Sequence, residues 1–334
     1  MRVLVVNAGS SSLKLRLLDD QDNVEQRADL PAGPDGLSAR LSKVLAGWSR
    51  PQVIGHRIVH GGNFFAGPVR VNDQVRDQLQ ELTDLAPLHQ PKSLAALDAV
   101  TRRLPDVPAV ASFDTAFHAA IPPAAATYAV PVEWRMRYGI RRYGFHGLSH
   151  DYCSGRAADL VDRPLADLRV ITCHLGAGAS LAAVLGGRSV DTTMGFTPLE
   201  GLVMATRSGT VDPGLVLWLE EHEHLSPHEV AVALEERSGL TALAGIGGMR
   251  EVEAAAEHGE PDALFAIDVY IHRLVGGIGA MSAATGGLDV LVFTGGVGEN
   301  SALVRRRAAE RLAYLGVTID HYRNDHQVND MRWP

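Results

Sequence analysis

One pattern occurs twice in this chain, and it constrains the fold more than any other feature. Residues 3–6 form an apolar run that enters the small polar turn 7–12, and the alternating segment 13–18 leaves that turn. Residues 169–184 repeat the pattern at an offset of 167 residues, about half of the 334-residue chain. Continuous apolar runs indicate buried strands, and alternation indicates half-buried ones. We therefore predict two copies of a unit that opens with a β-hairpin, with chance agreement as the alternative.

The turns of these hairpins carry groups that bind phosphate. Glycines, hydroxyls, an amide and a lysine supply hydrogen-bond donors, although a polar hairpin without a ligand is the alternative reading. A third apolar run, 289–294, ends in the glycine-rich turn 295–298, and Ser301 is placed to cap the basic helix 305–311. Free N–H groups at such a loop and helix start attract anions. Three elements of this kind favour a phosphate-binding protein.

Two of the other apolar strands carry charged residues. Arg57 lies inside the run 53–59, where a structural ion pair and an anion-binding role are equally compatible with the sequence. Asp114 follows the run 108–113, at the strand end where α/β sheets collect ligand groups, or else it caps the next helix. His146 and His150 have the spacing of a helical zinc pair, but the glycine between them argues against zinc.

Composition narrows the class of protein. A hydrophobic fraction of 46% with 21% charged residues is that of a globular protein long enough for two domains. The formal net charge of −8 argues against nucleic acid as the main partner. We see no leader sequence and no apolar run near the roughly 18 residues of a membrane span. We therefore expect a cytoplasmic protein without a membrane partner, whose two cysteines, Cys153 and Cys173, stay reduced.

Helical spacing and capping signals predict the remaining elements. A short amphipathic segment is expected at 37–45, and helices are expected at 74–85, from Ser93 onward, 151–160, 226–237 and 261–285. The helix at 226–237 opens with the capping-box sequence Ser-Pro-His-Glu, and 261–285 is apolar enough to be buried at an interface. The glycine-rich segments 206–214 and 242–248 are expected to be loops.

Taken together, these segments resemble the acetate kinase family, in the actin-like (ribonuclease H-like) ATPase-domain superfamily. The resemblance runs from Val3 to about Asn324, and its motifs follow in the family's order: Asn-x-Gly-Ser-Ser-Ser-Leu-Lys, Gly-His-Arg-Ile-Val-His-Gly-Gly, Ala-Pro-Leu-His, Phe-Asp-Thr-Ala-Phe-His, Arg-Tyr-Gly-Phe-His-Gly-x-Ser-His and Thr-Pro-Leu-Glu-Gly. It implies an α/β fold of two actin-like ATPase domains, 1–117 and 118–334, with an active-site cleft between them. The second domain would bind nucleotide and form a homodimer, to which 261–285 is a plausible contributor.

The resemblance also implies an activity and the residues that carry it. The reaction would be reversible transfer of the ATP γ-phosphoryl group to acetate, giving acetyl phosphate and ADP, with Mg²⁺ (or Mn²⁺). The catalytic residues would be Arg57, Asp114, His146 and Arg207, with Asn7 and Asp114 at the metal. Arg57, Val59, Leu88, His89, Phe145 and Pro198 would bind the acyl substrate. The nucleotide side would comprise Asn7, Ser10, Ser12, Lys14, His174, Gly176, Gly178, Arg250, Gly295, Gly296, Gly298, Glu299 and Asn300.

The chemistry of the substrate agrees with such a residue set. A carboxylate acceptor with a pKa of about 4 to 5 is already ionised at neutral pH, so it needs no general base. Two negative reactants need cations that neutralise their charge and align them, which two arginines, a histidine and Mg²⁺ supply. A valine at position 59 resembles acetate-preferring members of the family more than those that take propionate.

The departures from the family pattern cluster on the nucleotide side. Ala177 stands where the family has Asn, Thr210 where Asp is usual, and Gly248 where an Asp precedes the Met-Arg pair. The family's C-terminal segment, with a Glu that helps to bind Mg²⁺, has no counterpart after Asn324. The alternatives are therefore a propionate or short-chain acyl kinase, a weakened kinase or one with another phosphoryl donor, and a non-catalytic paralogue that binds acyl phosphate or a protein.

Overall fold

The computed structural model describes residues 1–9, 12–31, 36–86 and 90–326. The chain divides into two compact units: unit 1 is Met1–Ala119 with Phe145–Leu148, and unit 2 is Ala120–Gly144 with Ser149–Pro334. The predicted second domain included Phe145–Leu148, but two contacts hold this segment to unit 1. The Gly147 N–H donates to the Asp114 carbonyl at 2.8 Å, and a His118 ring nitrogen lies 3.1 Å from the Phe145 carbonyl oxygen.

Unit 1 is built on a six-stranded sheet with the order β3-β2-β1-β4-β6-β5. The strands are β1 (Val3–Ala8), β2 (Ser12–Leu18), β3 (Val24–Pro31), β4 (Val53–Ile58), β5 (Val69–Arg70) and β6 (Ala109–Phe113). β1 and β2 form the predicted hairpin, in which Asn7 pairs with Lys14. β4 lies parallel to both β1 and β6, so the carboxyl ends of these three strands meet at one edge of the sheet.

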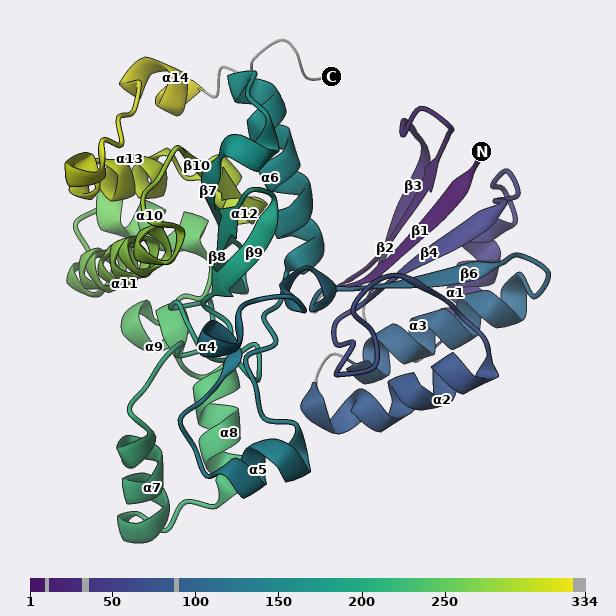
Figure 1. Ribbon diagram of the computed structural model, residues 1–334, viewed down its shortest axis with the longest axis horizontal. Helices are drawn as coiled ribbons and strands as arrows, with labels where there is room; N and C mark the ends of the chain where they lie inside the picture. Colours follow the sequence, from purple (N-terminus) through teal and green to yellow (C-terminus); the bar gives the residue numbers. More distant parts are fainter. Residues whose placement is uncertain (10–11, 32–35, 87–89, 327–334) are drawn as a thin grey trace. The chain divides into compact units, whose positions relative to one another are not determined.

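Helices cover one face of this sheet, as Figure 1 shows. They are α1 (Leu37–Leu45), α2 (Asp73–Glu81) and α3 (Gln90–Arg103), with short 3-10 turns at Leu82–Leu85 and Ala116–His118. The amphipathic segment at 37–45 forms helix α1, whereas the predicted helix at 74–85 is an α-helix only to Glu81. α3 begins three residues before the predicted start, because Pro91 lies in the first turn, where a missing N–H costs nothing.

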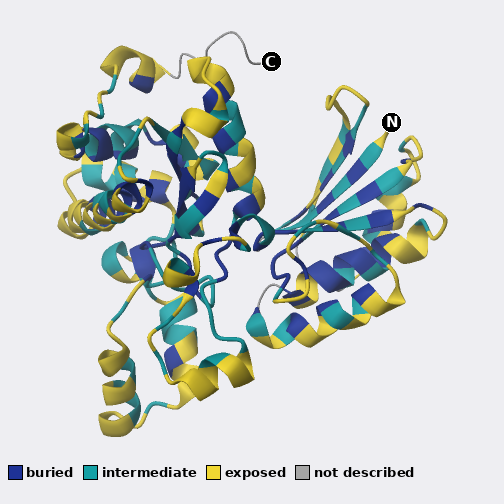
Figure 2. Cartoon of the chain, in the orientation of Figure 1, coloured by how far each residue is buried: buried dark blue, intermediate teal, exposed yellow. Residues whose placement is uncertain are grey.

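Unit 2 contains a four-stranded sheet with the order β10-β7-β8-β9. Its strands are β7 (Arg169–Leu175), β8 (Ala179–Leu185), β9 (Arg188–Thr192) and β10 (Val290–Thr294). Read from β9 to β10, order and direction reproduce β3-β2-β1-β4 of unit 1. The predicted duplication is therefore confirmed at the level of topology. Six of the seven β8 residues are buried, as their continuous apolar run predicts (Figure 2).

The remaining helices run from Pro123 to His326: α4 (Pro123–Ala126), α5 (Val132–Tyr138), α6 (Gly147–Val161), α7 (Pro213–His222), α8 (Pro227–Glu236), α9 (Gly239–Ala244), α10 (Met249–Glu257), α11 (Pro261–Thr285), α12 (Gly295–Asn300), α13 (Ala302–Arg311) and α14 (His321–His326). The capping box of α8 is confirmed, with Ser226 and Glu229 bonded reciprocally. The predicted loop 242–248 begins only after Ala244, because α9 continues until Gly245 takes a left-handed conformation with φ of 69°.

α11 corrects one expectation about membranes. By length and composition alone this helix could cross a bilayer, so it was wrong to expect no such segment. Ten of its residues, spaced three or four apart, are buried, and the helix packs on β8, β7 and β9. This placement is that of a core helix of a globular unit.

Candidate active site

Arg57 is held by two partners at the carboxyl ends of the central strands of unit 1. Its Nε donates to both carboxylate oxygens of Asp114, at 3.0 and 3.1 Å, and its Nη1 donates to the Asn7 amide oxygen at 3.0 Å. The Asp114 side chain is 2% exposed, and that of Arg57 is 25% exposed. Burial lowers the pKa of Arg57, but the charge and hydrogen bonds of Asp114 outweigh burial, so the net shift is upward. A permanent positive charge with a fixed orientation results.

Asp114 does not cap the following turn, which answers one question that the sequence left open. Thr115, not Asp114, stands at the start of the turn Ala116–His118, and no side chain caps it. The Thr115 hydroxyl instead accepts a hydrogen bond from the Gly61 N–H at 3.0 Å. The Asp114 carboxylate is therefore committed to Arg57, and its backbone to the neighbouring segment.

That neighbouring segment carries His146 in a rare backbone conformation. His146 has a φ of 57°, in the left-handed region that residues other than glycine seldom adopt. Gly147 follows, and a Cβ there would collide with the Asp114 carbonyl oxygen and lie 2.9 Å from the Phe117 Cβ. Only a glycine allows the two backbones to approach this closely, so the sequence fixes the position of His146 beside Asp114.

The predicted acyl-binding residues of unit 1 form part of its apolar interior. Val59 is 5% exposed and Phe145 is 1% exposed, and the Phe145 ring meets the His60 ring edge-on at 5.5 Å. Leu88 and His89, together with Ser10 of the hairpin turn, lie outside the described residues. Val59 therefore lies buried just after the end of β4, the strand that carries Arg57, and Phe145 is buried in the same unit.

The oxygen atoms at Arg57 are of the kind that Mg²⁺ prefers. Mg²⁺ is typically held by one or two carboxylates together with phosphate oxygens and water, rather than by a cage of protein ligands. The Asp114 carboxylate and the Asn7 amide oxygen supply such ligands side by side on one guanidinium. Within the described residues no group of three His, Cys, Asp or Glu side chains could hold a metal ion. A metal here would therefore depend on the phosphates of its substrate.

In unit 2, two further predicted residues meet. The Arg207 Nη1 donates to the Pro198 carbonyl at 3.0 Å. Burial lowers the pKa of Arg207, and the charge of Glu235 counteracts this only in part. A buried guanidinium of this kind favours an anionic ligand, because a negative partner offsets the cost of desolvation.

The second hairpin of the duplication is anchored by histidines. His174 lies near the end of β7. Its Nδ1 forms a hydrogen bond of 2.8 Å with the Ser149 hydroxyl. Both ring nitrogens of His150 are engaged, by Thr172 at 2.6 Å and Ser180 at 2.8 Å. His150 is therefore a buried structural residue of unit 2, not a zinc ligand.

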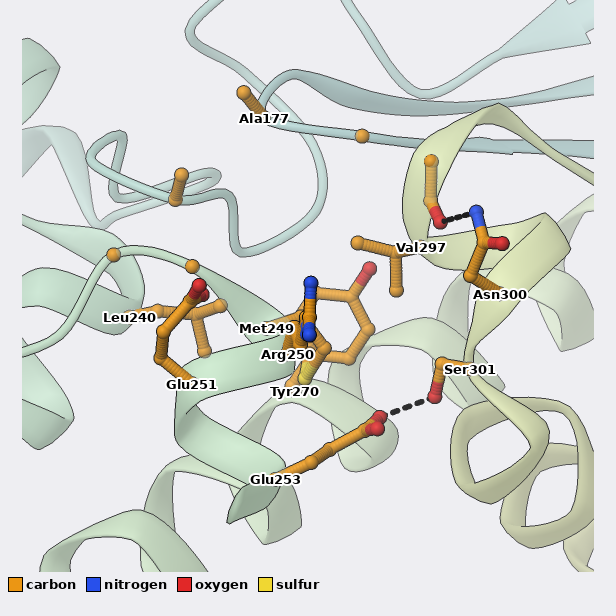
Figure 3. Close-up of a pocket in the computed structure, with 15 residues that line it drawn as sticks. Ala177, Leu240, Met249, Arg250, Glu251, Glu253, Tyr270, Val297, Asn300 and Ser301 are labelled. Atoms are coloured by element: carbon orange, nitrogen blue, oxygen red, sulfur yellow. Dashed lines mark hydrogen bonds between the residues drawn. The ribbon is translucent and has the colours of Figure 1, made fainter. Parts of the chain in front are cut away.

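A cavity of about 650 Å³ lies beside this hairpin, entirely within unit 2 (Figure 3). It is formed by the hairpin turn, the start of α10, the middle of α11 and the α12 segment. The lining residues are Gly176, Ala177, Ala205, Leu240, Gly247, Gly248, Met249, Arg250, Glu251, Glu253, Tyr270, Gly296, Val297, Asn300 and Ser301. Its size lies in the range of small-molecule sites.

Four predicted nucleotide residues line this cavity: Gly176, Arg250, Gly296 and Asn300. His174, Gly178, Gly295, Gly298 and Glu299 lie on the same elements but outside the lining. The Gly295 N–H is not free for an anion, because it donates to the Glu299 carboxylate at 3.2 Å. In unit 1, Ser12 and Lys14 open β2, with Lys14 exposed opposite Asn7.

Comparison with known proteins then places the chain in a family. A profile of the acetokinase family matches residues 37–332. Acetate kinases from Microcystis aeruginosa and Gloeobacter violaceus are 43% and 44% identical to it, with 99% of this chain and 92% of each relative covered. The chain belongs to the acetokinase family. The expected fold class, two α/β units of the actin-like ATPase type, and the expected enzyme class, phosphotransfer to a carboxyl group, are those of this family.

Solved structures agree with this membership. A propionate kinase from Francisella tularensis superposes with a TM-score of 0.91 at 35% identity, covering 97% of this chain and 91% of its own. The acetate kinase of Porphyromonas gingivalis gives a TM-score of 0.88 at 35% identity, covering 97% and 90%. The fold is therefore shared over nearly the whole chain.

The departures from the family pattern do not share one location. Ala177 and Gly248 both line the unit 2 cavity. Thr210 lies elsewhere: its hydroxyl accepts from the Gly201 N–H at 3.1 Å. The cavity residues Glu253 and Tyr270 were missed by sequence reasoning: Tyr270 lies inside the predicted helix 261–285, and no element was predicted around Glu253.

Proposed function

We propose that this protein catalyses reversible transfer of the γ-phosphoryl group of ATP to acetate, giving acetyl phosphate and ADP. One observation carries the proposal: a partly exposed Arg57 is fixed by a buried Asp114 and by Asn7 at the strand ends of unit 1. A cation positioned in this way suits the anionic transition state of phosphoryl transfer.

The step needs charge neutralisation rather than proton transfer. An acetate oxygen forms a bond to the γ-phosphorus as the bond to the β–γ bridging oxygen breaks, and ADP leaves with the electron pair. Acetate is already ionised at neutral pH, so no general base is needed. We assign Arg57, Arg207 and His146 to the transferring phosphoryl group, where one arginine can contribute about 10³ to 10⁵ in rate.

Mg²⁺ and the nucleotide complete the proposed site. We assign the metal to Asp114 and Asn7 with the substrate's phosphates, where it would neutralise phosphate charge when bound. We assign the nucleoside to the unit 2 cavity, with the hairpin residues Ser12 and Lys14 along the phosphate path. The size of the cavity and its lining by Gly176, Arg250 and Asn300 support this assignment.

The acyl group is the point where a second substrate competes. The similarity to the Francisella propionate kinase favours propionate as the alternative acceptor. Val59 supports acetate, because its two methyl groups would leave less room for the acyl chain than a smaller residue would. The ratio of kcat/KM for acetate to kcat/KM for propionate decides between the two acceptors. Val59→Ala is expected to raise kcat/KM for propionate.

The function is tested by two measurements on the same preparation. Calorimetric titration with Mg-ATP reports binding, and trapping of acetyl phosphate with hydroxylamine reports turnover. Binding together with acetate-dependent turnover supports the kinase. Binding of Mg-ATP without acetate-dependent turnover would instead support a non-catalytic paralogue, and the absence of both binding and turnover would refute the proposal.

Assembly and location follow as further proposals. We propose a cytoplasmic location, and we propose a homodimer that pairs through unit 2, because α5, α7 and the first turns of α11 each carry exposed apolar side chains. These side chains are Val132, Trp134, Met136, Tyr138, Leu215, Leu217, Trp218, Leu264 and Phe265. Sedimentation velocity should give twice the 35.8 kDa chain mass, and Trp134→Glu should shift the protein toward the monomer. A wild-type monomer at micromolar concentration would refute the dimer.

A further inference from the structure

The unit 2 cavity contains a carboxylate in an unexpected place. Gly248 is the N-cap residue of α10, and Glu251 is the third residue of that helix. A Cβ built on Gly248 would overlap Glu251 Oε2 and lie 3.0 Å from the Glu251 carboxyl carbon. Figure 3 shows the Glu251 side chain turning back from α10 toward the loop that precedes the helix. The Glu251 carboxylate therefore occupies the space that a side chain at position 248 would fill.

The contacts of Glu251 within the described residues indicate no other role for its side chain. Its carboxylate makes no hydrogen bond or ion pair with any residue in the described ranges, and it is exposed at the cavity rim. Gly248 has a φ of −87° and a ψ of 125°, which any residue can adopt, so the glycine is not needed for backbone geometry. The missing side chain at 248 is what makes room for Glu251.

A second observation indicates that this cavity holds a polar ligand. Tyr270 lines its floor and is 3% exposed, and its hydroxyl has no hydrogen-bond partner among the described residues. Buried hydroxyls are nearly always satisfied, so an orphan one beside a cavity marks a place for a ligand or an ordered water.

The residues that line the cavity offer surfaces for different parts of a nucleoside. Leu240 and Met249 are buried at 2% and 5% exposure, and with the Tyr270 ring they offer apolar surface for a flat base. Arg250 and Glu251 are both exposed at the rim. A cation there suits phosphate, whereas a carboxylate only accepts hydrogen bonds and so needs donors. The donors next to the phosphates of a nucleotide are the ribose hydroxyls.

We propose that Glu251 stands in for a side chain at Gly248 and accepts hydrogen bonds from the ribose hydroxyls of the bound nucleotide. This inference rests on the proposed function, because it takes a nucleotide to be the ligand of the cavity. It assigns ribose recognition to a residue three positions further along the chain, on the first turn of a helix instead of in the loop before it.

A purely structural role for Glu251 makes a different prediction. An acidic side chain in the first turn interacts favourably with the helix dipole and would stabilise α10 without any ligand. Under that role, replacing Glu251 would change stability but would not change which sugar the protein prefers. Selectivity between ribose and deoxyribose is therefore the readout that separates the two roles.

The test measures Kd by calorimetry for ATP, 2′-deoxy-ATP and 3′-deoxy-ATP. The wild type should bind ATP about tenfold or more tightly than at least one of the two analogues, as expected for a hydrogen bond to a charged group. Glu251→Ala should remove this preference and leave KM for acetate unchanged. Gly248→Ala should have the same effect, because its methyl group displaces the carboxylate. Glu257→Ala, at the far end of the same helix, should keep the preference.

A carboxylate swap gives the sharpest result. The double variant Gly248→Asp with Glu251→Ala returns a carboxylate to the same space from the other backbone position, so it should restore the preference for ribose. An unchanged preference in Glu251→Ala, equal binding of all three nucleotides by the wild type, or no restoration in the double variant would overturn the inference. Absence of any nucleotide binding would instead overturn the proposed function itself.

Discussion

The Arg57 side chain has both a structural role and a chemical role. It compensates the charge of Asp114, which is 2% exposed, and it presents the rest of its guanidinium at the strand ends. Arg57→Ala should lower kcat by about 10³-fold or more, since an arginine at a transferring phosphoryl group contributes that much. It should also lower the free energy of unfolding by about 3–5 kcal/mol, because it leaves a buried carboxylate without a partner. Steady-state kinetics and urea unfolding measure the two effects.

A matched ion pair serves as the control. Arg76 contacts Asp98 through Nε at 2.7 Å and Nη2 at 2.8 Å, with side chains 26% and 32% exposed. Arg76→Ala should cost about 1 kcal/mol or less and leave kcat unchanged. Arg57→Lys should recover stability but not rate, because lysine cannot reproduce the planar two-point contact. If Arg57→Ala keeps more than a tenth of wild-type activity, the catalytic assignment fails.

At the scale of elements, the start of α6 fixes the distance between His146 and Asp114. Gly147→Ala should lower the free energy of unfolding by about 1–3 kcal/mol, because its methyl group would collide with the Asp114 backbone and the Phe117 Cβ. It should also reduce kcat, since His146 moves with the helix start. Thermal unfolding and kinetics check both effects.

The same helix contains its own control for this prediction. A Cβ at Gly155 would meet nothing within 4 Å, so Gly155→Ala should leave activity intact and raise stability by up to about 1 kcal/mol. If Gly147→Ala behaves like Gly155→Ala, the close approach at Asp114 does not position His146.

The hairpins were predictable from sequence for a physical reason. An apolar run followed by a small polar turn and a second run has few folded solutions, so both β1–β2 and β7–β8 follow from periodicity. The partner of Arg57 was not predictable in this way. Its pairing with Asp114 depends on the parallel register of β4 and β6, in which Arg57 faces Ser112, two residues before Asp114. Register between strands more than fifty residues apart is a tertiary property.

The unit 2 cavity shows what a sequence pattern could not predict. From the sequence, Gly248 indicates the loss of a carboxylate, because the family motif records only which residue stands at each position. The return of that carboxylate through Glu251 depends on where α10 begins and on the absence of a Cβ at its N-cap. Both facts are geometric, so a departure from a motif was visible in the sequence but its compensation was not.

At the scale of the whole molecule, buried histidines should set the pH dependence of stability. Burial lowers the pKa of His56, His60 and His118 to about 4 each. The ordinary value of about 6.5 applies in the unfolded chain, so the unfolded state binds more protons between pH 6.5 and 4. Stability should therefore be full above pH 6.5 and fall as the pH drops toward 4, by up to about 1.4 kcal/mol per pH unit for each histidine.

A single variant tests this linkage. His56→Leu removes one titrating group from a site that is 2% exposed, so the slope of the unfolding free energy between pH 6.5 and 4 should decrease by about one proton. Asp289 adds little to this slope, because its pKa is lowered by its hydrogen bonds to Arg169 and its contribution is lost mainly below about pH 5. Urea unfolding at half-unit pH steps measures the slope. Stability that stays constant from pH 7 to 4.5 would show that these histidines are protonated in the folded protein or reach water there.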